Sequence, residues 1–349
     1  LSGATLTEVR HSWELDSGPL TLEAAEVTVA DPMTDETGKV TGFGSIAWKD
    51  AVLINGKGVQ ITTKDGSAAD VIQPQALRAG QLPMSALAFS GMTVTRSGED
   101  RRISIDSFEA DGITGYTLAD ARLQNLSVDQ EKPLRVGGMT ATAIDLTALS
   151  RLGPNPDPAQ VIAALSERSA GTITVNDIVV PEAEGGAARI DTVKIDHQAT
   201  EDGAIRLTFD ARGFSGPVPA DNELASFGAQ RVDGDIAFTY AFDPAKGDLA
   251  IQDVSFTLEE FGTLSGAMHL SGLPDIRRMA ASPNQAAMKV ALREASLSWQ
   301  DDGALDRLVQ RVAREQNMEA TEVRSRAARD ARGALDPQTA EALAGFIED

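Results

Sequence analysis

The chain has 349 residues, contains no cysteine and carries a formal net charge of −21 at pH 7. The lack of cysteine excludes disulfides, thiolate zinc sites and a cysteine nucleophile, and the negative charge argues against general binding of nucleic acids. Hydrophobic residues make up 42% of the chain but aromatic residues only 5%, so we expect a core built from aliphatic side chains.

A recurring octet, Φ-x-Φ-x-x-Φ-x-Φ with Φ apolar, is the main feature of the first 300 residues. The segment Gly171 to Val180, "GTITVNDIVV", is a clear copy. In chain order the octet occurs at residues 4–11, 20–27, 46–53, 87–94, 103–110, 121–128, 134–141, 173–180, 188–195, 249–256 and 290–297.

The octet predicts a β-strand with a local irregularity at its centre. At 100° per residue its four apolar positions fall on no single helical face, whereas each half alternates as a strand does. The central spacing of three allows two solutions: a β-bulge that keeps both halves on one face, or a strand that buries opposite faces along its length. Dipeptides such as Asn176-Asp177 and Gly137-Gly138 tolerate unusual backbone angles and favour the bulge.

Successive copies are separated by polar, turn-like segments such as "TRSGED" and "DQEKP", which predict hairpins. Plain alternation at 205–209, 236–242 and 264–270 predicts further strands. The fold class expected is mainly β: a long, curved, largely antiparallel repetitive sheet of a dozen or more bulged strands. Residues 1–300 would form this sheet domain.

Helices are expected at few places. Residues 157–168 begin with Asp and Pro, which suits a helix start, and a short helix is expected at 273–282. Residues 301–349 form a predicted C-terminal helical region. Its first helix carries an apolar stripe, its second has Thr321 as N-cap and ends at Gly333, and its third carries Leu343 and Phe346.

Sustained alternation implies one apolar and one wetter face, so a curved sheet would offer an apolar groove. The candidate groove-lining residues are Leu87, Phe89, Ile103, Ile105, Ile173, Val175, Ile190 and Ile251. On the first C-terminal helix Arg307, Arg311 and Arg314 form a basic stripe that could contact an anionic lipid surface. The favoured alternative is a solvated face paired with local carboxylates at helical spacing.

No catalytic, cofactor-binding or metal-binding residue is assigned, and we do not expect an enzyme. His11, His197 and His269 lie in or beside predicted strands without metal-ligand spacing. The acidic segments 34–39 and 109–114 do not complete a calcium loop, so solvated loops are favoured over a weak Ca²⁺ site. No nucleophile elbow, dinucleotide fingerprint or Walker loop occurs.

The iterated strands with leading glycines, as in "GSIAWKDAVLI" and "GTITVNDIVV", resemble the AsmA-like and YdgA-like periplasmic proteins of Gram-negative bacteria. The segment from Leu297 to Asp330 looks more specifically like part of the YdgA-like group. Its matching residues are Asp302, Leu305, Arg307, Gln316, Met318 and Arg324. The resemblance implies an exported envelope protein with an elongated β-sheet groove, linked to envelope integrity and, in larger relatives, to phospholipid transport.

Two functions are therefore weighed. The first is a non-enzymatic cell-envelope protein whose groove takes a lipid acyl chain. The second is a structural or interaction module that docks a protein partner through a sheet edge or the C-terminal helices. Carbohydrate binding fits less well, because the chain has only three Trp and two Tyr. The start at Leu1 is read as loss of a signal or N-terminal anchor, which with the resemblance places the protein in the periplasm.

Overall fold

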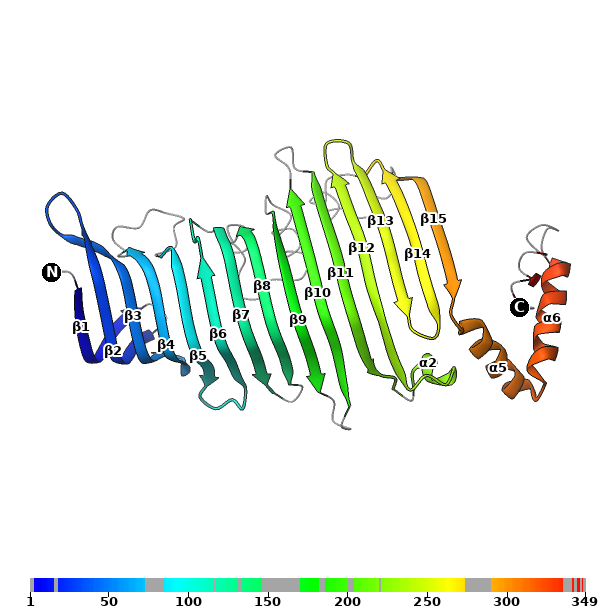
Figure 1. Ribbon diagram of the computed structural model, residues 1–349, viewed down its shortest axis with the longest axis horizontal. Coiled ribbons are helices and arrows are strands. Elements are labelled where there is room, and N and C mark those ends of the chain that lie inside the picture. The colour runs from blue at the N-terminus through cyan, green and yellow to red at the C-terminus, as the bar shows by residue number, and fades with distance from the viewer. Residues whose placement is uncertain are drawn as a thin grey trace.

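The protein forms one open antiparallel β-sheet, followed by helices at its C-terminal edge (Figure 1). The computed structural model describes residues 3–15, 18–72, 84–115, 117–130, 133–145, 170–181, 186–199, 204–219, 221–273, 290–334, 341, 344–345 and 347. Within these residues fifteen strands are hydrogen-bonded in strict chain order, each antiparallel to the next. The expected fold class is confirmed.

The sheet is a simple up-and-down meander. Its strands are β1 Gly3–Leu15, β2 Gly18–Thr34, β3 Val40–Asn55, β4 Val59–Ile72, β5 Ala86–Arg96, β6 Arg102–Asp111, β7 Thr117–Asp129, β8 Leu134–Asp145, β9 Gly171–Pro181, β10 Ala187–Ala199, β11 Ile205–Pro217, β12 Arg231–Asp243, β13 Asp248–Leu258, β14 Gly262–Ser271 and β15 Ala291–Asp301. The described helices are α2 Glu223–Ser226, α5 Ala304–Gln316 and α6 Ala320–Ala334. Figure 1 shows the strands side by side in one broad twisted layer, with α5 and α6 beyond β15.

Each octet of the middle strands directs its apolar positions to one face of the sheet. Strand β7 is an example. The central dipeptide of its octet, Gln124-Asn125, is exposed, and the four apolar positions on either side of it are more buried: Ala121, Leu123, Leu126 and Val128. One face therefore stays apolar along the strand, as predicted. Cross-strand pairing joins these positions into continuous rows, one of which runs through Phe89, Phe108, Leu123, Met139, Val175 and Val193.

The irregularity at the centre of the octet is a single residue with left-handed backbone, and it recurs on every odd-numbered strand from β1 to β13. These residues have φ between 47° and 63°. Gly, Asn and Asp adopt this region most readily among the common residues. The seven residues are Glu8, Asp50, Gly91, Asn125, Asp177, Gly213 and Asp253.

These seven residues and the positions opposite them on the even-numbered strands define what we call the kink row. In the ladder between β9 and β10, Ile178 pairs with Ile190 and Asn176 pairs with Thr192, so Asp177 lies opposite Asp191. The opposing positions are Ala25, Lys64, Asp106, Gly137, Asp191, Asp235 opposite Gly213, Phe238 opposite Asp253, and Ala267.

The bulge prediction is correct for the last strands and needs correction for the earlier ones. The register shifts by one residue at the kink row between β11 and β12, between β12 and β13 and between β13 and β14, as a β-bulge requires. From β3 to β10 the register passes the kink row unchanged. In each pair only the odd-numbered strand carries the left-handed residue of the kink row, and a single residue of its neighbour lies opposite it, so no residue is in excess.

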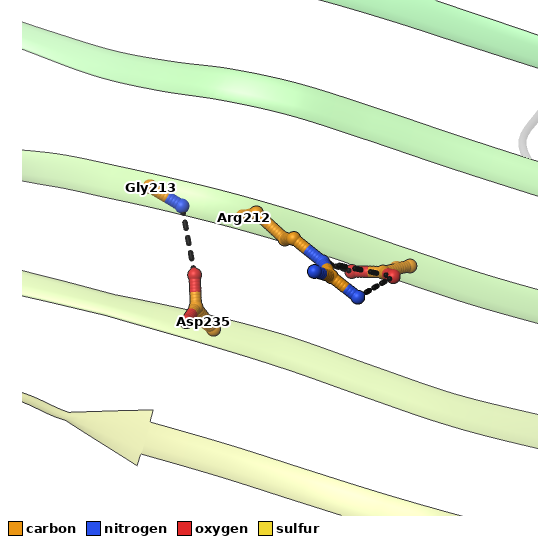
Figure 2. Close-up of polar contacts among 4 residues, drawn as sticks. Arg212, Gly213 and Asp235 are labelled. Atoms are coloured by element: carbon orange, nitrogen blue, oxygen red, sulfur yellow. Dashed lines mark hydrogen bonds and ion pairs between the residues drawn. The ribbon is translucent and has the colours of Figure 1, made fainter.

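Polar contacts within the kink row hold neighbouring strands together. The backbone N–H of Gly213 on β11 donates a hydrogen bond of 2.8 Å to Oδ1 of Asp235 on β12 (Figure 2). On β6 and β7, the Asn125 side-chain amide donates to Asp106 at 2.8 Å. Beside the row, Nε and Nη2 of Arg212 donate to Oδ1 (2.9 Å) and Oδ2 (2.8 Å) of Asp210 on the same strand, and these bonds raise the pKa of the guanidinium (Figure 2).

Two details of the strand prediction differ from the structure. In β2 the octet is shifted by two residues relative to the predicted frame: Ala24 is buried and Ala25 is exposed, because Ala25 is the position opposite the left-handed residues Glu8 and Asp50. The strand β4 was not predicted. Its octet positions are Ile61, Thr63, Gly66 and Ala68, only two of which are strongly apolar.

The C-terminal helices pack against each other through Val309, Ala313 and Val323, with Met318 beside them. Helix α5 ends at Gln316, and the left-handed backbone of its C-cap Asn317 (φ 51°) turns the chain toward α6. Thr321 lies inside α6 rather than at its N-cap, because the helix already begins at Ala320. The predicted helices at 157–168 and 273–282 lie outside the described residues, as does most of the third C-terminal helix.

Candidate functional site

The predicted groove-lining residues lie on one face of the sheet, spread from β5 to β13. Leu87 and Ile173 belong to one cross-strand row, and Ile105 and Ile190 belong to another. Ile103 pairs with Val128. The structure therefore brings these residues onto a shared surface, which we call the apolar face, rather than into a single cluster.

Ile251 and the three tryptophans of the chain lie farther out on this same face. Ile251 pairs with Tyr240 and Met268, and burial raises the pKa of Tyr240. The tryptophans also occupy octet rows, with Trp13 opposite Leu20, Trp48 opposite Val27 and Trp299 opposite Leu264.

Burial of the apolar face changes from the middle of the sheet to its edges. In the middle, Ile105 and Leu123 are each 9% exposed. On β15, Leu297 is 77% exposed and Leu292 is 61% exposed, although both continue the apolar rows through β14. On β1 at the opposite edge, Leu6 is 54% exposed. The apolar face thus reaches both edge strands and is open to solvent there.

The edge strand β15 exposes its side chains to solvent, and along one edge its backbone is not paired with another described strand. Its residues from Ala291 to Gln300 are all exposed. Among the described strands it pairs with β14 alone. An edge with free backbone groups and apolar side chains is a surface that can accept a further strand.

The three arginines of the predicted basic stripe are held by contacts within the protein. Arg307 forms an ion pair with Glu260, and its guanidinium lies 5.0 Å from the centre of the Phe261 ring. Arg311 pairs with Glu315 at 2.8 Å, at the helical spacing of four. Its guanidinium lies 4.9 Å from the Phe227 ring. The Arg314 side chain donates to the backbone carbonyl of Gln310 at 3.3 Å.

A pocket of about 330 Å³ lies at the corner where α2, the β13–β14 turn, the end of β15 and the start of α5 meet. Its lining is almost wholly apolar. We call it the corner pocket; its lining residues are Leu224, Phe227, Phe261, Trp299, Asp301, Ala304, Leu305 and Leu308.

The polar member of this lining, Asp301, is engaged by the start of α5. Its two carboxylate oxygens accept hydrogen bonds from the backbone N–H groups of Gly303 (3.2 Å) and Leu305 (3.1 Å). The carboxylate is thereby fixed at the pocket wall by backbone donors at the start of α5, whose N-cap is Gly303.

The acidic loop considered for Ca²⁺ uses its carboxylate internally. Oδ1 of Asp35 accepts hydrogen bonds from the Thr37 hydroxyl (2.6 Å) and from the backbone N–H groups of Thr37 and Lys39. These bonds lower the pKa of Asp35. In the part of the chain that the structure describes, no three His, Asp or Glu side chains are grouped so as to hold a metal ion.

The three histidines lie within strands, His11 on β1, His197 on β10 and His269 on β14. The helices of the described ranges include none that is both long enough and apolar enough to cross a membrane.

The corner pocket was not predicted from the sequence. Phe227 and Phe261 lie in turns far from α5 in the chain, and only the order of strands brings them beneath Arg311 and Arg307. The sequence did predict the apolar stripe of α5 that contains Leu305 and Leu308. That pattern does not indicate which residues elsewhere in the chain pack against the stripe.

A protein-family model described only as an uncharacterized protein matches residues 255–349. The match begins in β13 and includes β14, β15, α5 and α6. No curated protein and no solved structure matches the chain.

Proposed function

We propose that this chain is a non-enzymatic cell-envelope protein whose apolar face holds lipid acyl chains, in lipid binding, lipid transport or envelope maintenance. The observation that carries the proposal is the continuity of the apolar rows from β1 to β15 together with their exposure at both edges. Each apolar side chain that an acyl chain covers contributes about 1.5–3 kcal/mol, so an exposed row several strands wide favours such a ligand.

The resemblance of the octets and of the segment around Asp302 and Arg324 to AsmA-like and YdgA-like proteins supports the same proposal. That resemblance also favours a periplasmic location. The acidic net charge of −21 fits a binding mode governed by the apolar face rather than by attraction to anionic surfaces.

The proposal is tested with Trp13 and Trp48, which lie on the apolar face away from the corner pocket, in the native protein and in Trp299→Phe. The protein is mixed with phosphatidylethanolamine whose acyl chains are brominated, because bromine quenches indole fluorescence only at close range. We expect strong quenching of both proteins, and mass spectrometry of the purified protein should find copurifying phospholipid. No quenching and no lipid would overturn the proposal.

A matched pair of variants on β15 locates the binding. Leu297→Lys places a charge on the apolar face, whereas Ser298→Lys places the same charge on the other face of the same strand. Lipid binding should weaken for Leu297→Lys and stay unchanged for Ser298→Lys. Equal effects would contradict binding to the apolar face.

The exposed edge of β15 favours a second candidate function, a structural or interaction module that adds a partner strand to this edge. Replacing Ser296 with Pro would remove one backbone donor from β15. If this module is the function, Ser296→Pro abolishes a complex that remains intact in Leu297→Lys. Cross-linking in the cell envelope with a photoreactive residue at Ser298 would identify the partner strand.

A further inference from the structure

We infer that the corner pocket binds a single-chain amphiphile with an anionic head group. This site adjoins the apolar face, with which it shares Trp299, and the inference is independent of the function proposed for that face. The alkyl chain lies against Leu224, Phe227, Trp299 and Leu305, and the head group contacts Arg307 and Arg311.

The size and lining of the pocket fit one alkyl chain. Its volume of about 330 Å³ is at the lower end of the range for small-molecule pockets, about 300–1,000 Å³. Two apolar side chains of the lining are still partly exposed to solvent: Leu308 is 45% exposed and Trp299 is 44% exposed. Covering these side chains with an alkyl chain is favourable, because it removes apolar surface from water.

The charge at the rim selects the head group. Arg307 lies over the Phe261 ring and Arg311 over the Phe227 ring, and both rings line the pocket. The two arginines are four residues apart on α5, so their guanidinium groups lie on the same side of the helix. Each guanidinium group therefore lies against an aromatic ring of the pocket lining, and in the proposed complex the two groups contact a carboxylate or sulfate head group.

The existing ion pairs of these arginines can give way to a ligand. The partner carboxylates are exposed, Glu260 by 76% and Glu315 by 60%, and exposed ion pairs contribute little to stability. A guanidinium has five N–H donors, and the contacts with Glu260 and Glu315 engage Nη2 of Arg307 and Nε of Arg311. Donors remain in the same planar fork for a second anion.

The test uses monomeric dodecanoate below its micellar concentration, with dodecyl maltoside as the neutral amphiphile of equal chain length. Isothermal titration calorimetry on the full chain should show saturable binding of dodecanoate with one site and clearly weaker binding of the maltoside. Absence of dodecanoate binding, or equal affinity for both amphiphiles, would overturn the inference.

Two pairs of variants assign the site. Leu308→Asp places a charge at the pocket wall, and Gln310→Asp adds the same charge on an exposed position of α5. Arg307→Gln with Arg311→Gln removes the rim charge, and Arg326→Gln with Arg329→Gln removes the same charge from α6. The first member of each pair should weaken dodecanoate binding by about tenfold or more, the equivalent of about one charge-assisted hydrogen bond. The second member should leave it unchanged.

The outcomes separate this site from the apolar face. If Leu297→Lys weakens dodecanoate binding and Leu308→Asp does not, the ligand occupies the apolar face and the corner pocket is empty. If the protein binds only vesicles of anionic phospholipid and never monomeric dodecanoate, the arginines contact a surface and the inference is wrong. Failure of lipid binding at the apolar face leaves the prediction for the corner pocket unchanged.

Discussion

The indole of Trp48 on β3 lies across Gly66, the residue opposite it on β4. A Cβ atom on Gly66 would come within 2.1 Å of Cε2 and Cζ2 of the ring. The ring is fixed in this position by a hydrogen bond of 2.9 Å from its Nε1 to the hydroxyl of Thr63, also on β4. One aromatic side chain therefore covers two positions of the β4 octet that lack a large apolar residue of their own.

Gly66→Ala is expected to destabilise the protein by about 1–3 kcal/mol, because the added methyl group displaces the indole from its place. Gly138→Ala is the control. It lies on a strand as well, but a Cβ there meets nothing nearer than the Leu123 carbonyl oxygen at 3.8 Å. Urea unfolding followed by circular dichroism measures both, and equal free energies of unfolding would contradict the account of Trp48.

The kink row predicts a specific order of stability at Asp177, whose φ is 55°. Asp177→Gly should be neutral or stabilising, since glycine adopts left-handed backbone without steric cost. Asp177→Val should cost about 1–2 kcal/mol, because an L-residue with a branched Cβ clashes in that region. Thr174→Val, in the regular part of the same strand, is the control. Urea unfolding measures the free energy of unfolding of each variant, which should decrease in the order Gly, Asp, Val at position 177.

The apolar face predicts different costs for the same truncation at two places. Leu123→Ala, at a position 9% exposed, should lower the free energy of unfolding by about 2–4 kcal/mol. Leu297→Ala, at a position 77% exposed, should change it by less than about 0.5 kcal/mol. Thermal or urea unfolding of the lipid-free protein compares them. A large loss for Leu297→Ala would show that this side chain is covered in solution.

The turn between β12 and β13 predicts an acid-sensitive contact. The ammonium of Lys246 donates to Asp243 at 2.7 Å, and this hydrogen bond lowers the pKa of the carboxyl group below its ordinary value of 3.8. Because the folded-state pKa is the lower one, the contact stabilises the fold fully above pH 3.8 and is lost as the pH falls through the folded-state pKa.

NMR titration of the side-chain carboxyl carbons measures this shift. Lys246→Gln should raise the pKa of Asp243 toward its ordinary value and leave the lowered pKa of Asp35 unchanged. Asp35 is a suitable internal control because its pKa is lowered chiefly by the hydroxyl of Thr37 in another turn. An unchanged Asp243 pKa in the variant would contradict the role of Lys246.

The sequence predicted the strands wherever apolar residues occupied the octet positions themselves. Copies such as Ile173 to Val180 needed no knowledge of a neighbour, because period-two alternation and a polar dipeptide are local signals. The strand β4 was missed because Trp48, on another strand, fills the space above Gly66. The unchanged register from β3 to β10 was also beyond a local pattern, since whether an irregularity shifts the register depends on the strand beside it.

The candidate site was predictable in part. Composition and alternation predicted one apolar face, and the structure describes where each predicted lining residue lies on it. The corner pocket depends on contacts such as that between Arg307 and Phe261, which are 46 residues apart in the chain. Nothing in the local sequence pattern of either segment specifies that contact. The corner pocket could therefore be found only from the three-dimensional structure.

The alternation of left-handed residues along the kink row has a consequence for how such a chain can change in length. Within the kink row, every second strand carries a left-handed residue and its neighbour does not. Deleting one strand would therefore place two left-handed residues, or two positions without one, side by side and would reverse the direction of all strands that follow. Loss or duplication of a whole hairpin, such as β7 with β8, leaves both the alternation and the strand directions intact. Homologues and engineered variants of this sheet should therefore differ in size by steps of two strands.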